Sequence, residues 1–429
     1  MYKKFKSQQK EEKSYNNCLF SSENVNVGHQ PEIDYLKTFL IYLMVNDHVY
    51  FHYSKGNFNF YKKMDFIIHI FGAGGFMFLM GIGMRYSKSH EPKNYFARGI
   101  ILLTQGQYVN FIRDCLPNLI VWWITGNKIF ISRALCILTV DILGFSGIAF
   151  WFLALMKIIK LSDYFILIIG IIMNIFAFSL PKIMKSPDNY LLSTFLGYFV
   201  LTDAESYFPF CSYFFFVAFG YWLGGIFQKI NNKDKFYNLV LIVYPPFLII
   251  YYIFRSNYNI PLLPKHLSDE HYSLYPFPDS MCSCMINLIA LAIFHKIDIM
   301  LKGKTPQFIS HAGKNVNDYY IISYILLYYL KTFLIATRGE NFPSKMNYPI
   351  SFSFVILIAS TIIIEINNRY IHFTIITLKN PVRNFVFALI WITNIIAVIY
   401  IYPKVEVYAT IWNNYLKDEN TNLNSQNKE

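Results

Sequence analysis

The chain has 429 residues, of which 55% are apolar, 19% aromatic and only 15% charged. Soluble domains carry roughly 25% charged residues, so this composition argues against a soluble globular protein. The net charge of +12 comes from Lys and Arg in short segments between long apolar runs. That distribution is typical of a protein in contact with membrane lipid and speaks against a nucleic-acid partner.

Apolar runs of about 17–25 residues recur along the chain, the length that an α-helix needs to cross a bilayer. They predict an all-α, polytopic transmembrane helix bundle of about eleven spans. The bundle occupies residues 33–402, between a polar cytoplasmic N-terminal tail (1–32) and a polar, disordered C-terminal tail (403–429). The expected spans are 33–52, 65–84, 97–115, 136–156, 163–181, 207–228, 236–254, 279–299, 317–336, 349–366 and 384–402.

Two apolar segments do not fit this series. Residues 116–130 contain Pro117 and Gly126, and we expect an interfacial or re-entrant piece there. Residues 190–201 form a short run that leads into the sixth span.

The basic residues indicate the orientation. With the N-terminus in the cytoplasm, 21 Lys and Arg side chains fall on the inner side and 16 on the outer side. The segment 85–98 is the clearest inner marker. We therefore expect a multi-pass protein of the cell membrane with a cytoplasmic N-terminus.

Polar side chains gather at both ends of the first span. Asp34 and Lys37 stand one helical turn apart near its inner end, where they can form a structural ion pair. Near the outer end, His48 and His52 share a helix face. A histidine is suited to take a proton from a hydroxyl or an amine, so His48 is our first candidate for a catalytic group. The alternative is that these residues only mark the end of the span.

Two neighbours of His48 extend this candidate site. Asp47 is a candidate helper, although it points about 100° away from His48 on a helix. Asn46 is a candidate on the substrate side, and so is His271 in the polar loop 255–278, which could close over the site or simply be exposed.

Other charged residues lie within or beside later spans. Arg98 and Arg113 bracket the third span, and Asp141 lies in the fourth. A structural role explains them, in which each carboxylate pairs with an Arg from another helix. The six Cys residues lack zinc-site spacing, so we expect no metal, and the sequence contains no Walker motif of an ATP-driven pump.

Several stretches, in order, resemble the membrane-bound acyltransferases related to heparan-α-glucosaminide N-acetyltransferase and, more distantly, the acyltransferase-3 O-acetyltransferases. Each stretch is short, but the ordered set covers residues 31–400. Lys37 and Thr38 depart from the family's usual Arg and Gly, and a Lys does not offer the bidentate fork of an Arg. The matching stretches are Ile33–Lys37, Leu43–His48, Phe76–Gly81, Arg98–Leu103, Asp141–Ala149 and Asn315–Ile322.

The resemblance implies an enzyme that takes an acyl group, typically acetyl from acetyl-CoA, on the cytoplasmic side. It would pass that group to a hydroxyl or amine of a glycan on the outer side. His48 would then act on the acceptor or carry the acyl group, with Asp47 and His52 as helpers. Arg85 and Arg98 would hold the phosphates of CoA.

Two other functions remain open from the sequence. A transporter or flippase for a polar or lipid-linked solute would use the same intramembrane charges as a permeation path. A non-catalytic member of the family would keep the fold without the reaction.

Overall fold

The computed structural model describes residues 18–53, 58–134, 137, 139–180, 187, 189–202, 207–257, 276–339, 349–371 and 381–403. Helices account for the regular structure, and an isolated β-bridge joins Phe20 to Ile230. The predicted C-terminal tail (403–429) and His271 lie outside the described residues, apart from residue 403 itself.

The described ranges hold eleven long helical stretches, which follow the predicted spans. Six of the helices are long and apolar enough to cross a membrane, and three shorter apolar helices accompany them. The prediction of an all-α polytopic bundle is therefore confirmed. The stretches are α2 (Pro31–Tyr53), α3 (Phe58–Tyr86), the run of α4 (Pro92–Asn110), η1 (Phe111–Cys115) and α5 (Leu116–Thr125), α7 (Ile142–Ile158), α8 (Asp163–Ser179), α10 (Phe210–Gln228), α11 (Lys233–Asn257), α12 (Phe277–Met300), α14 (Val316–Arg338), α15 (Pro349–Ile366) and a last helix, Pro381–Pro403.

The short helices are α6 (Lys128–Arg133), α9 (Tyr190–Gly197), α13 (Gln307–Lys314) and the π-helical turn η5 (Asn367–Ile371). The helix α9 corresponds to the short apolar run expected before the sixth span.

The third span differs from the prediction. The helix α4 passes through the π-helical turn η1 directly into α5, so residues 116–125 prolong the span and are not a separate re-entrant piece. Pro117 lies in the first turn of α5, directly after the π-helical turn η1, so the irregular turn stands where the proline removes a backbone hydrogen bond. The helix ends at Gly126, which adopts a left-handed conformation (φ 67°) that favours glycine.

Small residues allow the central helices to approach closely. A Cβ atom on Gly81 of α3 would lie 2.2 Å from the carbonyl oxygen of Val217 on α10. A Cβ atom on Gly220 of α10 would lie 2.0 Å from the carbonyl oxygen of Phe78 on α3. No side chain fits at either position without moving the helices.

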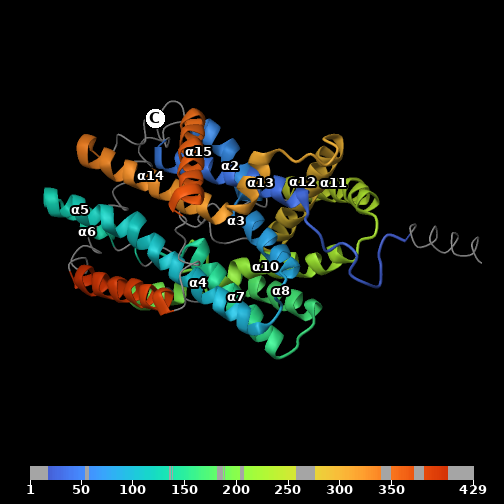
Figure 1. The fold of residues 1–429 in the computed structure, drawn as a ribbon, viewed down its shortest axis with the longest axis horizontal. Helices are drawn as coiled ribbons and strands as arrows, with labels where there is room; N and C mark the ends of the chain where they lie inside the picture. The colour runs from blue at the N-terminus through green and yellow to red at the C-terminus, as the bar shows by residue number, and fades with distance from the viewer. Residues whose placement is uncertain are drawn as a thin grey trace, which may run out of the picture.

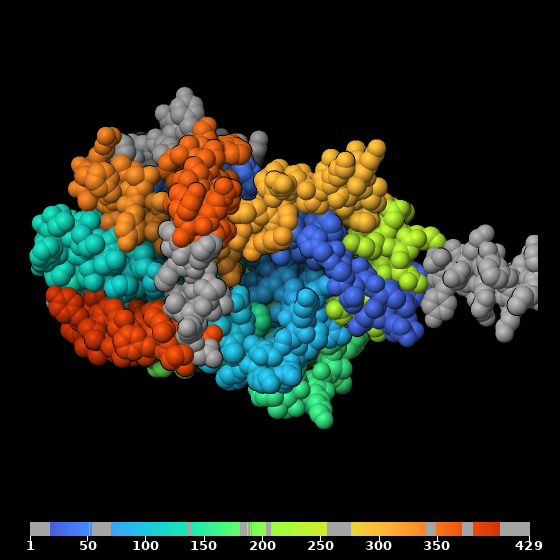
Figure 2. Space-filling model, in the orientation of Figure 1, coloured from blue at the N-terminus to red at the C-terminus, as the bar shows by residue number. Residues whose placement is uncertain are grey.

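Several of the helices form two groups (Figure 1). One group contains α2, α13, α14 and α15, and the other contains α3, α4, α7, α8 and α10. The last helix lies against α5 and α6, where Ala397 and Ile401 join a small apolar cluster with Cys115 and Ile131 (Figure 2).

One face of the bundle collects the ends of several helices, and we call it the Arg85 face. Arg85 at the end of α3 pairs with Asp163 at the start of α8, and its carbonyl accepts a hydrogen bond from Gln228 at the end of α10. Residues 18–30 also lie here, because their backbone bonds to residues 228–231 (Figure 2). Part of the expected N-terminal tail is therefore packed against the bundle.

Candidate functional site

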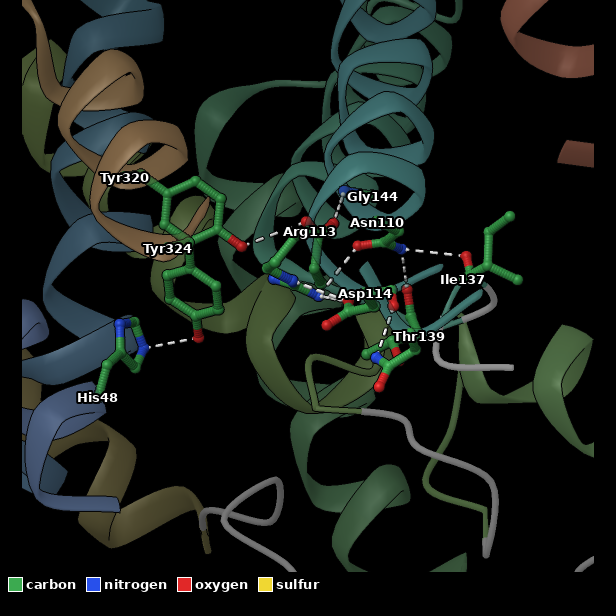
Figure 3. Close-up of polar contacts among 11 residues, drawn as sticks. His48, Asn110, Arg113, Asp114, Ile137, Thr139, Gly144, Tyr320 and Tyr324 are labelled. Atoms are coloured by element: carbon green, nitrogen blue, oxygen red, sulfur yellow. Dashed lines mark hydrogen bonds and ion pairs between the residues drawn. The ribbon is translucent and has the colours of Figure 1, made fainter. Parts of the chain in front are cut away.

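His48 lies in the second half of α2 and faces α14. Its Nε2 atom is 2.6 Å from the hydroxyl oxygen of Tyr324, a hydrogen bond between residues 276 apart in the sequence (Figure 3). Its Nδ1 atom is buried and has no hydrogen-bond partner in the described part of the chain. The ring therefore has one nitrogen engaged and one nitrogen available for chemistry.

Three tyrosines on α14 form a wall beside His48. Tyr320, Tyr324 and Tyr328 are spaced four residues apart, so they line one face of the helix. The rings of Tyr324 and Tyr328 stack with a centroid distance of 5.5 Å and an interplanar angle of 16°. The guanidinium carbon of Arg113 lies 4.7 Å from the Tyr324 centroid and 5.0 Å from the Tyr328 centroid. These are cation–π distances, so a fixed positive charge rests on the tyrosine wall.

Arg113 is held in place from the η1 side. Its Nη2 atom is 2.6 Å from the Asp114 carboxylate and donates to the Asn110 side-chain oxygen at 3.1 Å. The Asn110 amide in turn donates to the carbonyl oxygens of Ile137 and Thr139. Both members of the ion pair are buried. A buried pair with satisfied hydrogen bonds fixes geometry, whereas a half-satisfied one would be costly.

Asp141 has a different role from the one expected. It lies at the N-cap of α7 and not inside the fourth span, and its carboxylate accepts the backbone N–H of Gly144 at 2.9 Å. Its second oxygen accepts the hydroxyl of Tyr320 at 3.2 Å, and the positive charge of Arg113 acts on the same carboxylate. Asp141, at the start of α7, thus joins the two helix groups through the Tyr320 hydroxyl of α14.

The other candidates near His48 differ in their contacts: some contact α14, and others contact their own helix. His52 is buried, its Nδ1 atom lies 3.0 Å from the Lys331 ammonium, and its ring packs on Tyr328. Asn46 is fully buried and donates to the Tyr42 carbonyl of its own helix. Asp47 is partly buried beside His48.

A second polar feature lies on the Arg85 face. A cavity of about 550 Å³ is lined there by nine residues, of which three are cationic and none acidic. Lys157 comes from the last turn of α7, and its ammonium lies 4.8 Å from the Tyr95 centroid. The lining residues are Asn24, Val27, Arg85, Tyr86, Ser87, Lys88, His90, Lys157 and Gln228.

The field inside this cavity is positive. Burial, and after it the positive charges of Lys157 and Arg85, lowers the pKa of His90 below its usual value. Arg85 has the Asp163 carboxylate as a partner, with 3.2 Å between Nη2 and Oδ2. The cavity can therefore hold a polyanion.

Some of the predicted residues lie neither beside His48 nor in the lining of the cavity. Arg98 is half-buried in α4 and is not among the residues that line the cavity. Asp34 and Lys37 form the expected pair, with 3.8 Å between Oδ1 and Nζ, and Asp34 also lies 2.8 Å from His29. The Lys37 ammonium donates to the Gly313 carbonyl, so this pair joins α2 to α13. Within the described ranges, no group of three or more His, Cys, Asp or Glu residues is arranged to hold a metal.

Residues 30–254 match the family model for the catalytic region of heparan-alpha-glucosaminide N-acetyltransferase. The match covers more than half of the 429 residues. The chain belongs to this family. No curated protein and no solved structure shows a significant match to it.

Membership implies acetyltransferase activity on glycans. The matched residues include His48, Arg85 and Arg113, whereas the tyrosines of α14 lie beyond them.

These tyrosines were not among the predicted site residues. Their spacing of four residues on one predicted span was the available signal, because it places three hydroxyl-bearing rings on one helix face. Arg113 was recognised only as a residue at the end of its span. Its partner proved to be the adjacent Asp114 and not a carboxylate from another helix.

Proposed function

We propose that this protein takes an acetyl group from acetyl-CoA at the Arg85 face and transfers it to a hydroxyl or amine of an extracytoplasmic glycan. The observation that carries the proposal is the pairing, in a member of this acetyltransferase family, of a cationic cavity with a half-buried histidine farther along the bundle. In this proposal the Arg85 face is cytoplasmic, and the protein resides in the cell membrane.

The cavity suits the donor. Acetyl-CoA is a polyanion, and Arg85, Lys88 and Lys157 supply three positive charges without a carboxylate in the lining. Tyr86 and the aliphatic stems of the basic residues offer apolar surface beside those charges.

His48 suits the acceptor. In the transfer, the acceptor oxygen or nitrogen forms a bond to the acetyl carbon, the bond from that carbon to the CoA sulfur breaks, and the acceptor proton leaves. His48 takes that proton as a general base and can return it to the thiol of CoA. Neutral imidazole is the form required, and the buried position of Nδ1 excludes competing water.

The two features lie at different depths of the bundle. Asp34 marks the Arg85 face on α2, and His48 follows 14 residues later, which corresponds to about 21 Å along the helix axis. A donor bound at one face and an acceptor approaching from the other would therefore meet inside the bundle.

The test is acetyl transfer by the purified protein in proteoliposomes with labelled acetyl-CoA and glycan acceptors. We expect transfer by the native protein and its loss in His48→Ala. His29→Ala serves as the control, because the His29 side chain is 60% exposed at the surface. Full activity in His48→Ala would contradict the catalytic assignment. Solute uptake without acetyl transfer would instead support the transporter.

The orientation has its own test. Cys18 is exposed and lies in the segment packed on the Arg85 face. In a variant that keeps Cys18 as its only cysteine, a membrane-impermeant maleimide should label intact cells only after permeabilisation. Labelling of intact cells would place the N-terminus outside.

A further inference from the structure

The hydrogen bond between His48 and Tyr324 assigns different tasks to the two ring nitrogens. Nε2 is engaged by the Tyr324 hydroxyl at 2.6 Å, and a group approaching Nε2 would have to displace this hydroxyl. Nδ1 is buried without a partner in the described part of the chain. Only the tautomer with its proton on Nε2 leaves a lone pair on Nδ1.

We propose that Tyr324 is a positioning residue that holds His48 in the Nε2–H tautomer, so that Nδ1 accepts the proton of the acceptor. This inference rests on the proposed function, in which His48 is the general base. When Nδ1 takes the proton, the imidazolium still donates through Nε2–H to the tyrosine oxygen. The same contact therefore serves the ring before and after proton transfer.

The position of the Tyr324 hydroxyl is fixed by its ring contacts. Arg113 packs on the ring at 4.7 Å, Tyr328 stacks on it at 5.5 Å, and Tyr320 lies 4.9 Å away. His48 itself meets the ring edge-on, with 3.9 Å between centroids and an angle of 84°. A ring held on several sides has little freedom to move its hydroxyl away from His48.

Arg113 connects the Tyr324 ring to the other helix group. Its ion pair with Asp114 and its bond to Asn110 anchor it to η1 and α4. The bond between Tyr324 and His48 then connects α14 to α2. The orientation of the base thus depends on three helices, and it is set before substrate binds.

The experiment compares Tyr324→Phe with the native protein in the acetyl-transfer assay. The substitution removes the hydroxyl and keeps the ring on Arg113. We expect kcat to fall roughly 10- to 100-fold while KM for the donor and for the acceptor stays unchanged. Tyr319→Phe is the matched control, because its hydroxyl lies on the same helix but bonds Thr361 of α15. An unchanged kcat in Tyr324→Phe, or an equal loss in Tyr319→Phe, would overturn the proposal.

A second measurement does not depend on activity. Nitrogen-15 NMR of histidine-labelled protein in proteoliposomes reports which ring nitrogen carries the proton, and the spectrum of His48→Gln identifies the His48 signals. We expect a protonated Nε2 and an unprotonated Nδ1 in the native protein, and a mixture of tautomers in Tyr324→Phe. A native Nδ1–H tautomer, or an unaltered signal in Tyr324→Phe, would refute the inference. If the native protein transfers no acetyl group, the proposed function fails, and the spectrum still decides the tautomer.

Discussion

Replacing Lys157 with Gln tests the proposed donor cavity directly. The Lys157 ammonium lies over the rings of Tyr95 and Tyr221, and no described carboxylate is within ion-pair distance of it. Its charge is therefore fully available to a bound phosphate. Lys157→Gln removes that charge and keeps most of the side-chain length.

The size of the effect follows from Coulomb's law. Two unit charges about 6 Å apart interact by roughly 0.7 kcal/mol at the dielectric constant of water and roughly 2.8 kcal/mol at an effective value of 20. The cavity opens to solvent, so the lower end of this range applies, and we expect a loss of about 1 kcal/mol. That loss corresponds to an increase of about fivefold in KM for acetyl-CoA.

The assay measures initial rates of acetyl transfer against acetyl-CoA concentration at low and at high salt. KM should rise in Lys157→Gln, with kcat unchanged, and its salt dependence should weaken because fewer ions are displaced on binding. Lys93→Gln is the control, since Lys93 pairs with the exposed Glu91 at 2.7 Å and does not line the cavity. An unchanged KM in Lys157→Gln, or an equal increase in Lys93→Gln, would refute the donor assignment.

Arg85 allows a sharper version of this comparison. Arg85→Gln removes one cation and also leaves the Asp163 carboxylate without its partner beside the cavity. We therefore expect a larger increase in KM than for Lys157→Gln, and a partial recovery in Arg85→Gln combined with Asp163→Asn. If KM in the double variant is as high as in Arg85→Gln, the uncompensated Asp163 carboxylate is not the cause of the larger increase.

Three further predictions concern packing, the buried ion pair and pH. Gly220→Ala should lower the thermal midpoint of the purified protein, because overpacking costs about 1–3 kcal/mol, whereas Gly83→Ala should not, since its added Cβ meets nothing within 4 Å. Asp114→Asn should destabilise the protein by about 3–5 kcal/mol in an unfolding assay, because it leaves the buried Arg113 charge without its ion-pair partner. An unchanged free energy of unfolding would show that water reaches the pair. Donor phosphates should raise the lowered pKa of His90, so binding takes up a proton, and KM for acetyl-CoA should decrease as the pH is lowered through the titration of this histidine. The same pH dependence of KM in His90→Gln would show that His90 is not the titrating group.

Much of the architecture could be predicted from the sequence. Span length and apolarity are local properties, so most of the long helices begin and end within three residues of their expected positions. The pair Asp34–Lys37 could also be predicted, because residues one turn apart on a helix are neighbours whatever surrounds them. The continuous path from α4 to α5 was missed, because Pro117 and Gly126 resemble breakers when the rest of the helix is unknown.

The sites depend on tertiary structure. The sequence placed His48 and Arg85 among the candidates, but it offered no reason to join His48 to Tyr324, 276 residues away, or Arg85 to Lys157. Helical periodicity states which face of a helix is polar, and it does not state which helix that face meets. That choice is made by close packing, for example where Gly81 and Gly220 let two backbones touch, and this packing brings the cations of the cavity and the tyrosines beside His48 into place.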